Sequence, residues 1–156
     1  MKMYERLLWL ADDLATRGKN SLTLKRRAVS TAYYAVFHAL ARSCADALLS
    51  SKGAVDRNSK NYERVYRALD HGPLRNAFGA SPLKDDPAFK AIGNLVVRLQ
   101  IERHNADYLP SRRLYRQSEC LLLISSARQA IKLLRALDED RRLTLATSLL
   151  FKNRPS

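Results

Sequence analysis

Glycine and proline are scarce in this 156-residue chain, with five of each. Disordered segments are rich in such residues and poor in apolar ones, whereas 46% of the residues here are hydrophobic. The length is that of one ordinary domain and is enough to bury a single core without disulfides or metals. We therefore predict one folded domain over residues 1–156.

Sequence motifs of the common enzyme classes are missing. The chain has no P-loop, no glycine-rich dinucleotide turn, no nucleophile elbow and no H-E-x-x-H. The two cysteines, Cys44 and Cys120, stand in apolar surroundings without a C-x-x-C or a histidine at zinc-ligand spacing, which favours a role in core packing. We expect no metal and no cofactor.

Long hydrophobic runs are absent as well. No stretch approaches the roughly 20 apolar residues of a membrane-spanning helix. The N-terminal segment becomes acidic at Asp12 and Asp13 before the core of a signal peptide could form. The expected location is the cytoplasm, with no membrane partner.

Acidic residues are few relative to basic ones: 15 Asp and Glu stand against 28 Lys and Arg, a net charge of +13. The excess is partly clustered, and it favours a polyanionic partner, with nucleic acid, RNA included, first and an acidic protein second. A basic surface that only keeps the protein in solution is the alternative. Two clusters supply the predicted phosphate contacts, namely Lys25, Arg26 and Arg27, and Arg112, Arg113 and Arg116. A third cluster, to which no such role is given, is the pair Arg141 and Arg142.

The apolar residues recur at helical spacing, and no run alternates convincingly at period two. Asp86 and Pro87 form a typical helix start, with Asp as N-cap and Pro in the first turn, and Ser111 is placed to cap a later long helix. The predicted fold is all-α, an antiparallel helical bundle of five to six helices with two long central helices. The expected helices cover residues 3–16, 23–49, 61–69, 88–103, 111–137 and 138–149, with 72–86 largely irregular.

Functional groups are densest between residues 98 and 108. A metal-independent ribonuclease needs a group that moves protons and a cation that holds the charge on the phosphoryl oxygens, because the RNA 2′-hydroxyl is itself the nucleophile. His104 is a candidate general acid or base, and Arg98 or Arg103 a candidate phosphate ligand. The structural alternative is a helix C-terminus that favours basic residues, with Arg103 paired to Asp107.

Two segments resemble the HEPN domain family. Residues 26–40, RRAVSTAYYAVFHAL, are similar to the small-residue and aromatic second helix of those domains. Arg103-x-x-Ala106-Asp107-Tyr108 is similar to a turn in one branch of the family, and the order of segments agrees over roughly residues 3–150. The resemblance implies an antiparallel helical bundle that commonly dimerises.

The same resemblance implies a possible activity. Active members are metal-independent endoribonucleases with an R-x(4–6)-H motif at the dimer cleft, and Arg98-x5-His104 has that spacing. Leu99 departs from the polar residue that often follows the arginine, and the R-x-x-A-D-Y branch includes members without the histidine. In an unbroken helix a separation of six residues turns two side chains about 120° apart, so the pair converges only if the helix ends or distorts.

Other residues are candidate RNA ligands. Tyr34 and His38 lie four residues apart in the long second helix, which suits stacking on a base and a hydrogen bond to it, although buried packing is the alternative. Asp107 and Tyr108 belong to the same candidate set. A homodimer is predicted from an alanine stripe and from apolar positions in excess of one core: Ala28, Ala32, Ala35, Ala39, Trp9, Leu145, Leu149 and Phe151.

Three functions therefore compete. The first is a HEPN-type endoribonuclease of the toxin or phage-defence kind, with an antitoxin as partner. The second is a non-catalytic HEPN module that binds RNA, a nucleotide or a partner protein. The third is a dimerisation module that docks on an acidic protein, such as a nucleotidyltransferase.

Overall fold

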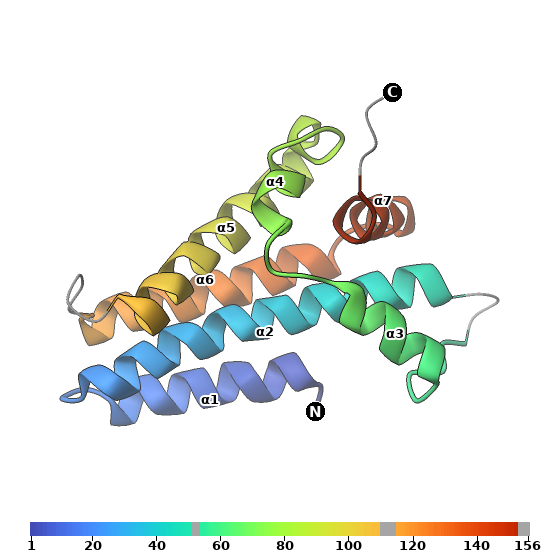
Figure 1. Cartoon of the computed structure of the whole chain (residues 1–156). Coiled ribbons are helices and arrows are strands. Elements are labelled where there is room, and N and C mark those ends of the chain that lie inside the picture. The colour runs from blue at the N-terminus through green and yellow to red at the C-terminus, as the bar shows by residue number, and fades with distance from the viewer. Residues whose placement is uncertain (51–53, 110–114, 153–156) are drawn as a thin grey trace. The chain divides into compact units, whose positions relative to one another are not determined.

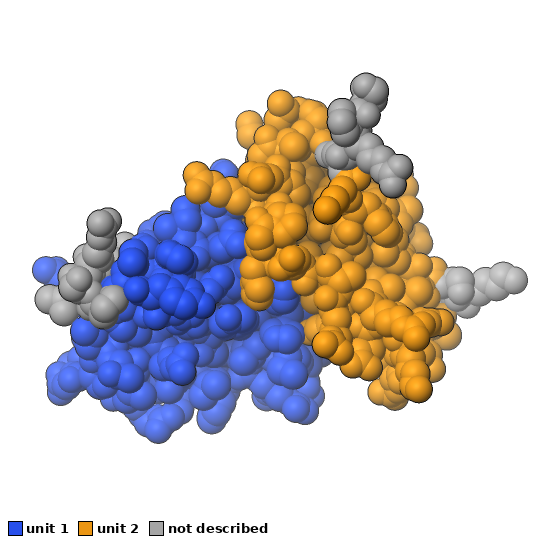
Figure 2. Space-filling model, in the orientation of Figure 1, with its two compact units in different colours: residues 1–39, 94–132 blue, residues 40–93, 133–156 orange. Residues whose placement is uncertain are grey.

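The computed structural model describes residues 1–50, 54–109 and 115–152 (Figure 1). These residues form two compact units, coloured separately in Figure 2. Unit 1 comprises residues 1–39 and 94–132, and unit 2 comprises residues 40–93 and 133–156. The expected cap Ser111 and the predicted phosphate contacts Arg112 and Arg113 lie outside the described residues.

The all-α prediction is confirmed, since the described residues contain seven α-helices, one short 3₁₀ helix and no β-strand. The count of α-helices exceeds the expected five or six because α4 forms within residues 72–86, which were expected to be largely irregular and which also contain the 3₁₀ helix. The helices are α1 (Met3–Arg17), α2 (Leu22–Leu49), α3 (Lys60–Ala68), α4 (Leu74–Phe78), η1 (Leu83–Asp85), α5 (Pro87–Tyr108), α6 (Gln117–Arg135) and α7 (Glu139–Leu150).

Two helix lengths differ from the expectation. α5 continues through Tyr108 instead of ending near Arg103, and α6 begins at Gln117 rather than at Ser111. The two long central helices were expected to have about 27 residues each; α2 has 28, but α6 has 19 and is shorter than α5, which has 22. The predicted start at Asp86 is confirmed, because its carboxylate accepts a hydrogen bond from the Ala88 N–H at 2.9 Å.

Unit 1 consists of α1, the first part of α2, the last part of α5 and most of α6. α1 and α2 run in opposite directions and are joined by a tight turn at Gly18 (Figure 1). A Cβ on Gly18 would lie 2.6 Å from the Leu14 carbonyl oxygen and 2.8 Å from the Leu24 Cβ, so only glycine fits there. Arg128 of α6 pairs with Asp12 of α1, and Gln117 donates to the Ala15 carbonyl at 3.2 Å.

Unit 2 contains the second part of α2, helices α3 and α4, the start of α5, and α7. α4 packs on α5 so closely that a Cβ on Gly93 would lie 2.8 Å from the Phe78 ring. Asp138 caps α7 by accepting from the Arg141 N–H at 2.8 Å, and the Arg141 Nε donates to Asp86 at 2.8 Å. One arginine thus joins the N-terminal ends of α5 and α7.

The core takes up several residues that motivated the predicted dimer. The four alanines of the stripe on α2 are at most 4% exposed, and Leu145 and Leu149 of α7 are buried as well. Trp9 and Phe151 remain exposed, at 64% and 61%. The alanine stripe therefore packs inside the chain and is no argument for a second copy.

Cys44 and Cys120 are free thiols in the core, and burial raises the pKa of Cys44 to about 12. Within the described residues, no helix has the length and apolar character needed to cross a bilayer.

Candidate nucleic-acid interface

The C-terminal end of α5 is held by an arginine from another helix. Arg26 of α2 donates to the carbonyl oxygens of Asn105, Ala106 and Leu109 at 3.2, 2.8 and 3.0 Å. The last carbonyls of a helix have no partners within it, and a cation there also suits the negative end of the helix dipole. Arg26 was predicted as a phosphate contact, but its guanidinium is used to extend α5 to Tyr108.

Because α5 is continuous, the two members of the R-x5-H motif point in different directions. The helix neither ends nor is interrupted between Arg98 and His104, so their side chains leave the axis about 120° apart. Both residues are exposed. One chain therefore does not bring the arginine and the histidine onto a common phosphate.

Arg103 lies in a pocket of tyrosine rings. Its guanidinium carbon is 5.2, 5.9 and 6.0 Å from the ring centres of Tyr33, Tyr34 and Tyr108, and its side chain is only 13% exposed. The Nη1 atom lies 3.9 Å from the Asp107 carboxylate, while the buried Nε has no hydrogen-bond partner among the described atoms. Cation–π attraction stabilises this arrangement, which turns the charge away from solvent.

Asp107 is held in turn from α2. Ser30, which is 3% exposed, donates its hydroxyl to the Asp107 Oδ2 at 3.2 Å. The ion pair that was the structural alternative for Arg103 and Asp107 is thus present, and it belongs to a network between α2 and α5. The predicted candidates Arg103, Asp107 and Tyr34 come together here.

His38, one turn further along α2 from Tyr34, is half-buried and lies edge-on to Phe37, with ring centres 6.1 Å apart. Burial lowers the pKa of His38 below its ordinary value of 6.5, which favours a neutral imidazole. Tyr34 contacts the ring of Tyr33 at 5.5 Å. Both side chains are half-buried and have ring neighbours on α2.

His104 and Tyr108 lie one turn apart at the exposed end of α5. Their ring centres are 5.1 Å apart with an interplanar angle of 44°, and Tyr108 is 62% exposed. We call these two residues the ring pair. Tyr108 is therefore both one of the three rings around Arg103 and the exposed member of the ring pair.

A hollow of about 780 Å³ lies where the turn after α1 meets the start of α6, and we call it the basic hollow. Three cations line it against one carboxylate, and among the described residues none of the three forms an ion pair. The sequence predicted Lys25 and Arg116 as phosphate contacts but missed Lys19 and the amide side chains, because only the fold brings the turn and α6 together. Its lining is Lys19, Asn20, Leu22, Lys25, Tyr115, Arg116, Gln117 and Glu119.

Arg27, also predicted as a phosphate contact, is exposed on α2 and is not part of this lining. Tyr115 is 2% exposed, and its hydroxyl donates to the backbone carbonyl and the carboxylate of Glu102, each at 3.2 Å. It forms a wall of the hollow rather than a ring on which a base can stack.

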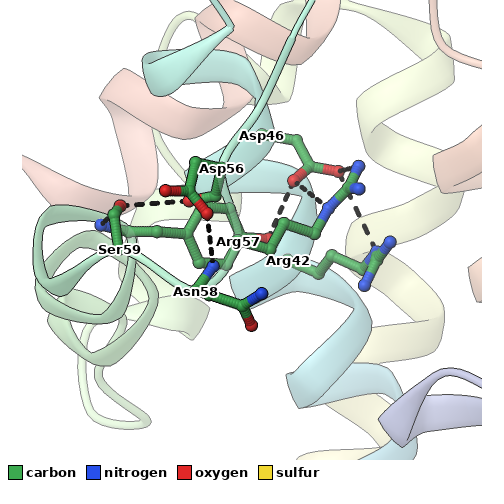
Figure 3. Close-up of polar contacts among 7 residues, drawn as sticks. Arg42, Asp46, Asp56, Arg57, Asn58 and Ser59 are labelled. Carbon is green, nitrogen blue, oxygen red and sulfur yellow. Dashed lines mark hydrogen bonds and ion pairs between the residues drawn. The ribbon is translucent and has the colours of Figure 1, made fainter.

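Unit 2 has a polar cluster of its own that sequence reasoning missed (Figure 3). Arg57 holds Asp46 with two hydrogen bonds of 3.1 Å, and the Tyr62 hydroxyl donates to the same carboxylate at 2.8 Å. Burial and the contact with Asp46 raise the pKa of Tyr62 to about 12. No local pattern identifies this cluster, because its members come from α2, a loop and α3.

The described residues contain no group of three or more His, Cys, Asp or Glu side chains arranged to hold a metal ion. In comparisons with protein-family models, curated proteins and solved structures, nothing matches this chain.

Proposed function

We propose that the protein binds RNA, and that the basic hollow of unit 1 receives the phosphate backbone. The observation that carries the proposal is the set of cations in a concave surface, Lys19, Lys25 and Arg116, which the described part of the chain does not neutralise by ion pairs. Cations left without carboxylates raise the local positive potential and attract a polyanion. The resemblance of residues 26–40 and 103–108 to HEPN domains, which form antiparallel helical bundles, supports the same function.

Salt dependence tests this proposal. Each phosphate contact releases counterions, so the logarithm of the affinity for single-stranded RNA falls with the logarithm of salt concentration by about 0.7 per contact. Lys25→Glu combined with Arg116→Glu is expected to weaken binding by roughly tenfold or more at moderate salt, and to make this slope shallower by about 1.4. Fluorescence anisotropy with a labelled RNA at several salt concentrations measures both quantities.

A matched control separates a local site from net charge. Lys84→Glu with Lys90→Glu changes the charge of the chain by the same amount, at two exposed positions of unit 2. This variant should keep its affinity within about threefold, since it removes long-range attraction and no phosphate contact. An equal loss in both variants, or binding by the wild type that ignores salt, would contradict the hollow as the site.

A metal-independent endoribonuclease is the second candidate, and it rests on the exposure of both Arg98 and His104 on α5. Since the two side chains diverge within one chain, cleavage requires that His104 of one copy meet an arginine of another. The homodimer implied by the HEPN resemblance would provide this, and sedimentation at micromolar concentration tests it: a monomer speaks against the nuclease.

Incubation with RNA in EDTA tests the activity itself. Cleavage by the wild type that His104→Ala and Arg98→Ala each abolish, with the helical circular dichroism spectrum retained, would support this candidate. Intact RNA that still binds in a salt-dependent manner would leave RNA binding as the function. An acidic protein partner, such as an antitoxin or a nucleotidyltransferase, would compete with RNA for the same cations.

A further inference from the structure

Tyr108 exposes a large part of an aromatic ring in an unusual setting for a surface residue. It is 62% exposed, yet it has the His104 ring at 5.1 Å and the Arg103 guanidinium at 6.0 Å from its centre. Trp9 is equally exposed, but among the described residues it makes no ring–ring or cation–π contact. The orientation of Tyr108 is therefore restricted from two sides while part of its surface stays open to solvent.

The guanidinium next to this ring is itself fixed. Asp107 pairs with Arg103 at 3.9 Å and accepts from the buried Ser30 at 3.2 Å, and the rings of Tyr33 and Tyr34 lie on the α2 side. The Arg103 Nε remains buried without a partner. A buried donor without a hydrogen bond is destabilising, so Arg103 is held in this position by its ion pair and the tyrosine rings rather than by complete hydrogen bonding.

We propose that the ring pair, His104 and Tyr108, is a stacking surface for an unpaired base of single-stranded RNA. An aromatic ring that is already oriented binds a base at a lower entropic cost, and stacking accepts any base because every base has a π-face. The ring pair supplies no phosphate contact, so its role differs from that of the basic hollow. This inference rests on the proposed RNA binding and adds the preference for unpaired bases.

The test compares Tyr108→Ala with Tyr108→Phe, which keeps the ring. The ligand is a single-stranded 2′-O-methyl oligoribonucleotide, which cannot be cleaved through its 2′-oxygen, and a duplex of the same sequence serves as the comparison. Tyr108→Ala should weaken single-strand binding about fivefold or more, whereas Tyr108→Phe should stay within about twofold of the wild type. Neither should alter duplex binding, and the salt slope should stay unchanged in both.

The possible results separate the two proposals. If the wild type binds with a steep salt dependence but Tyr108→Ala binds the single strand equally well, the stacking surface is wrong and RNA binding stands. If Tyr108→Ala lowers the affinity for the single strand and for the duplex equally, the stacking surface is also wrong. If the wild type binds neither oligonucleotide, the proposed function itself fails. Circular dichroism and urea unfolding of each variant confirm that only the exposed ring has changed.

Discussion

The two units carry the same number of basic residues but use them differently. Each contains 14 Lys and Arg, while unit 1 has 6 Asp and Glu and unit 2 has 9. In unit 2, Asp46 holds Arg57 and Arg42, and Arg141 bridges two carboxylates. In unit 1 the cations of the basic hollow have no such partners among the described residues.

This difference indicates why net charge alone is a poor guide to a binding surface. An arginine held by a carboxylate contributes little to the field felt by a ligand, whereas an unpaired lysine in a concavity contributes most of its charge. The unit 2 arginines named above are thus held by carboxylates, whereas the cations of the basic hollow in unit 1 are the ones that we propose meet RNA. Substitutions on either side of this contrast should change stability by different amounts, most at Asp46 and least at His38.

Removal of the Asp46 carboxylate should give the largest loss of stability. Asp46→Ala leaves the buried Tyr62 hydroxyl without its acceptor and Arg57 without its carboxylate, and we expect a loss of about 3 kcal/mol in the free energy of unfolding. Most of this comes from Tyr62, since the Arg57 pair is partly exposed and screened by solvent. Urea unfolding followed by circular dichroism measures the change.

RNA affinity is the second measurement for this variant. Because Asp46 belongs to unit 2, affinity should stay within about twofold of the wild type. The double variant Asp46→Ala, Tyr62→Phe should lose less stability than the sum of the single variants, because both remove the same hydrogen bond. A loss of RNA affinity as large as that of Lys25→Glu with Arg116→Glu would contradict the division of roles.

The turn of unit 1 should couple stability to binding. Gly18→Ala places a Cβ 2.6 Å from a backbone oxygen that cannot easily move, and we expect a loss of about 2 kcal/mol on urea unfolding. To relieve this contact the turn must move, and with it the neighbouring Lys19 of the basic hollow. RNA affinity should therefore fall as well. Gly72→Ala, where a Cβ meets nothing within 4 Å, is the control and should change neither quantity.

The smallest effect is a change in the pH dependence of stability. Burial lowers the pKa of His38 in the folded protein, so the unfolded chain takes up the proton first as the pH falls. The folded state therefore loses stability as the pH drops below about 6.5 and through the lower folded pKa. His38→Gln should show a weaker loss over this range in urea unfolding at pH 7 and pH 5; an identical pH dependence would contradict the effect of burial.

Local patterns in the sequence were sufficient for much of the fold. The start of α5 at Asp86, the acidic start of α7 and the extent of α2 follow from capping residues and apolar spacing, and the structure has all three within one or two residues. These features depend on residues close together in sequence, so they can be predicted without a structure.

The C-terminal end of α5 and the basic hollow could not be predicted from such local patterns. Nothing near Tyr108 in the sequence indicates that Arg26 will cap the helix, and nothing near Lys19 indicates that Arg116 will face the same hollow. Both depend on contacts between residues about 80 to 100 positions apart. Whether the Arg98 and His104 side chains converge or diverge depends on where α5 ends. It could therefore not be decided before the length of α5 was known.

The Arg26 cap also has a consequence for the order of folding. Its three hydrogen bonds join residues separated by 79, 80 and 83 positions, so closing them has a large entropic cost that an isolated helix cannot offset. The last turn of α5 should then form only after α2 has docked, and a peptide of residues 87–109 should fray there. In native-state hydrogen exchange the amides of this turn should open together with the α2 contact, which couples the order of the ring pair to the assembly of unit 1.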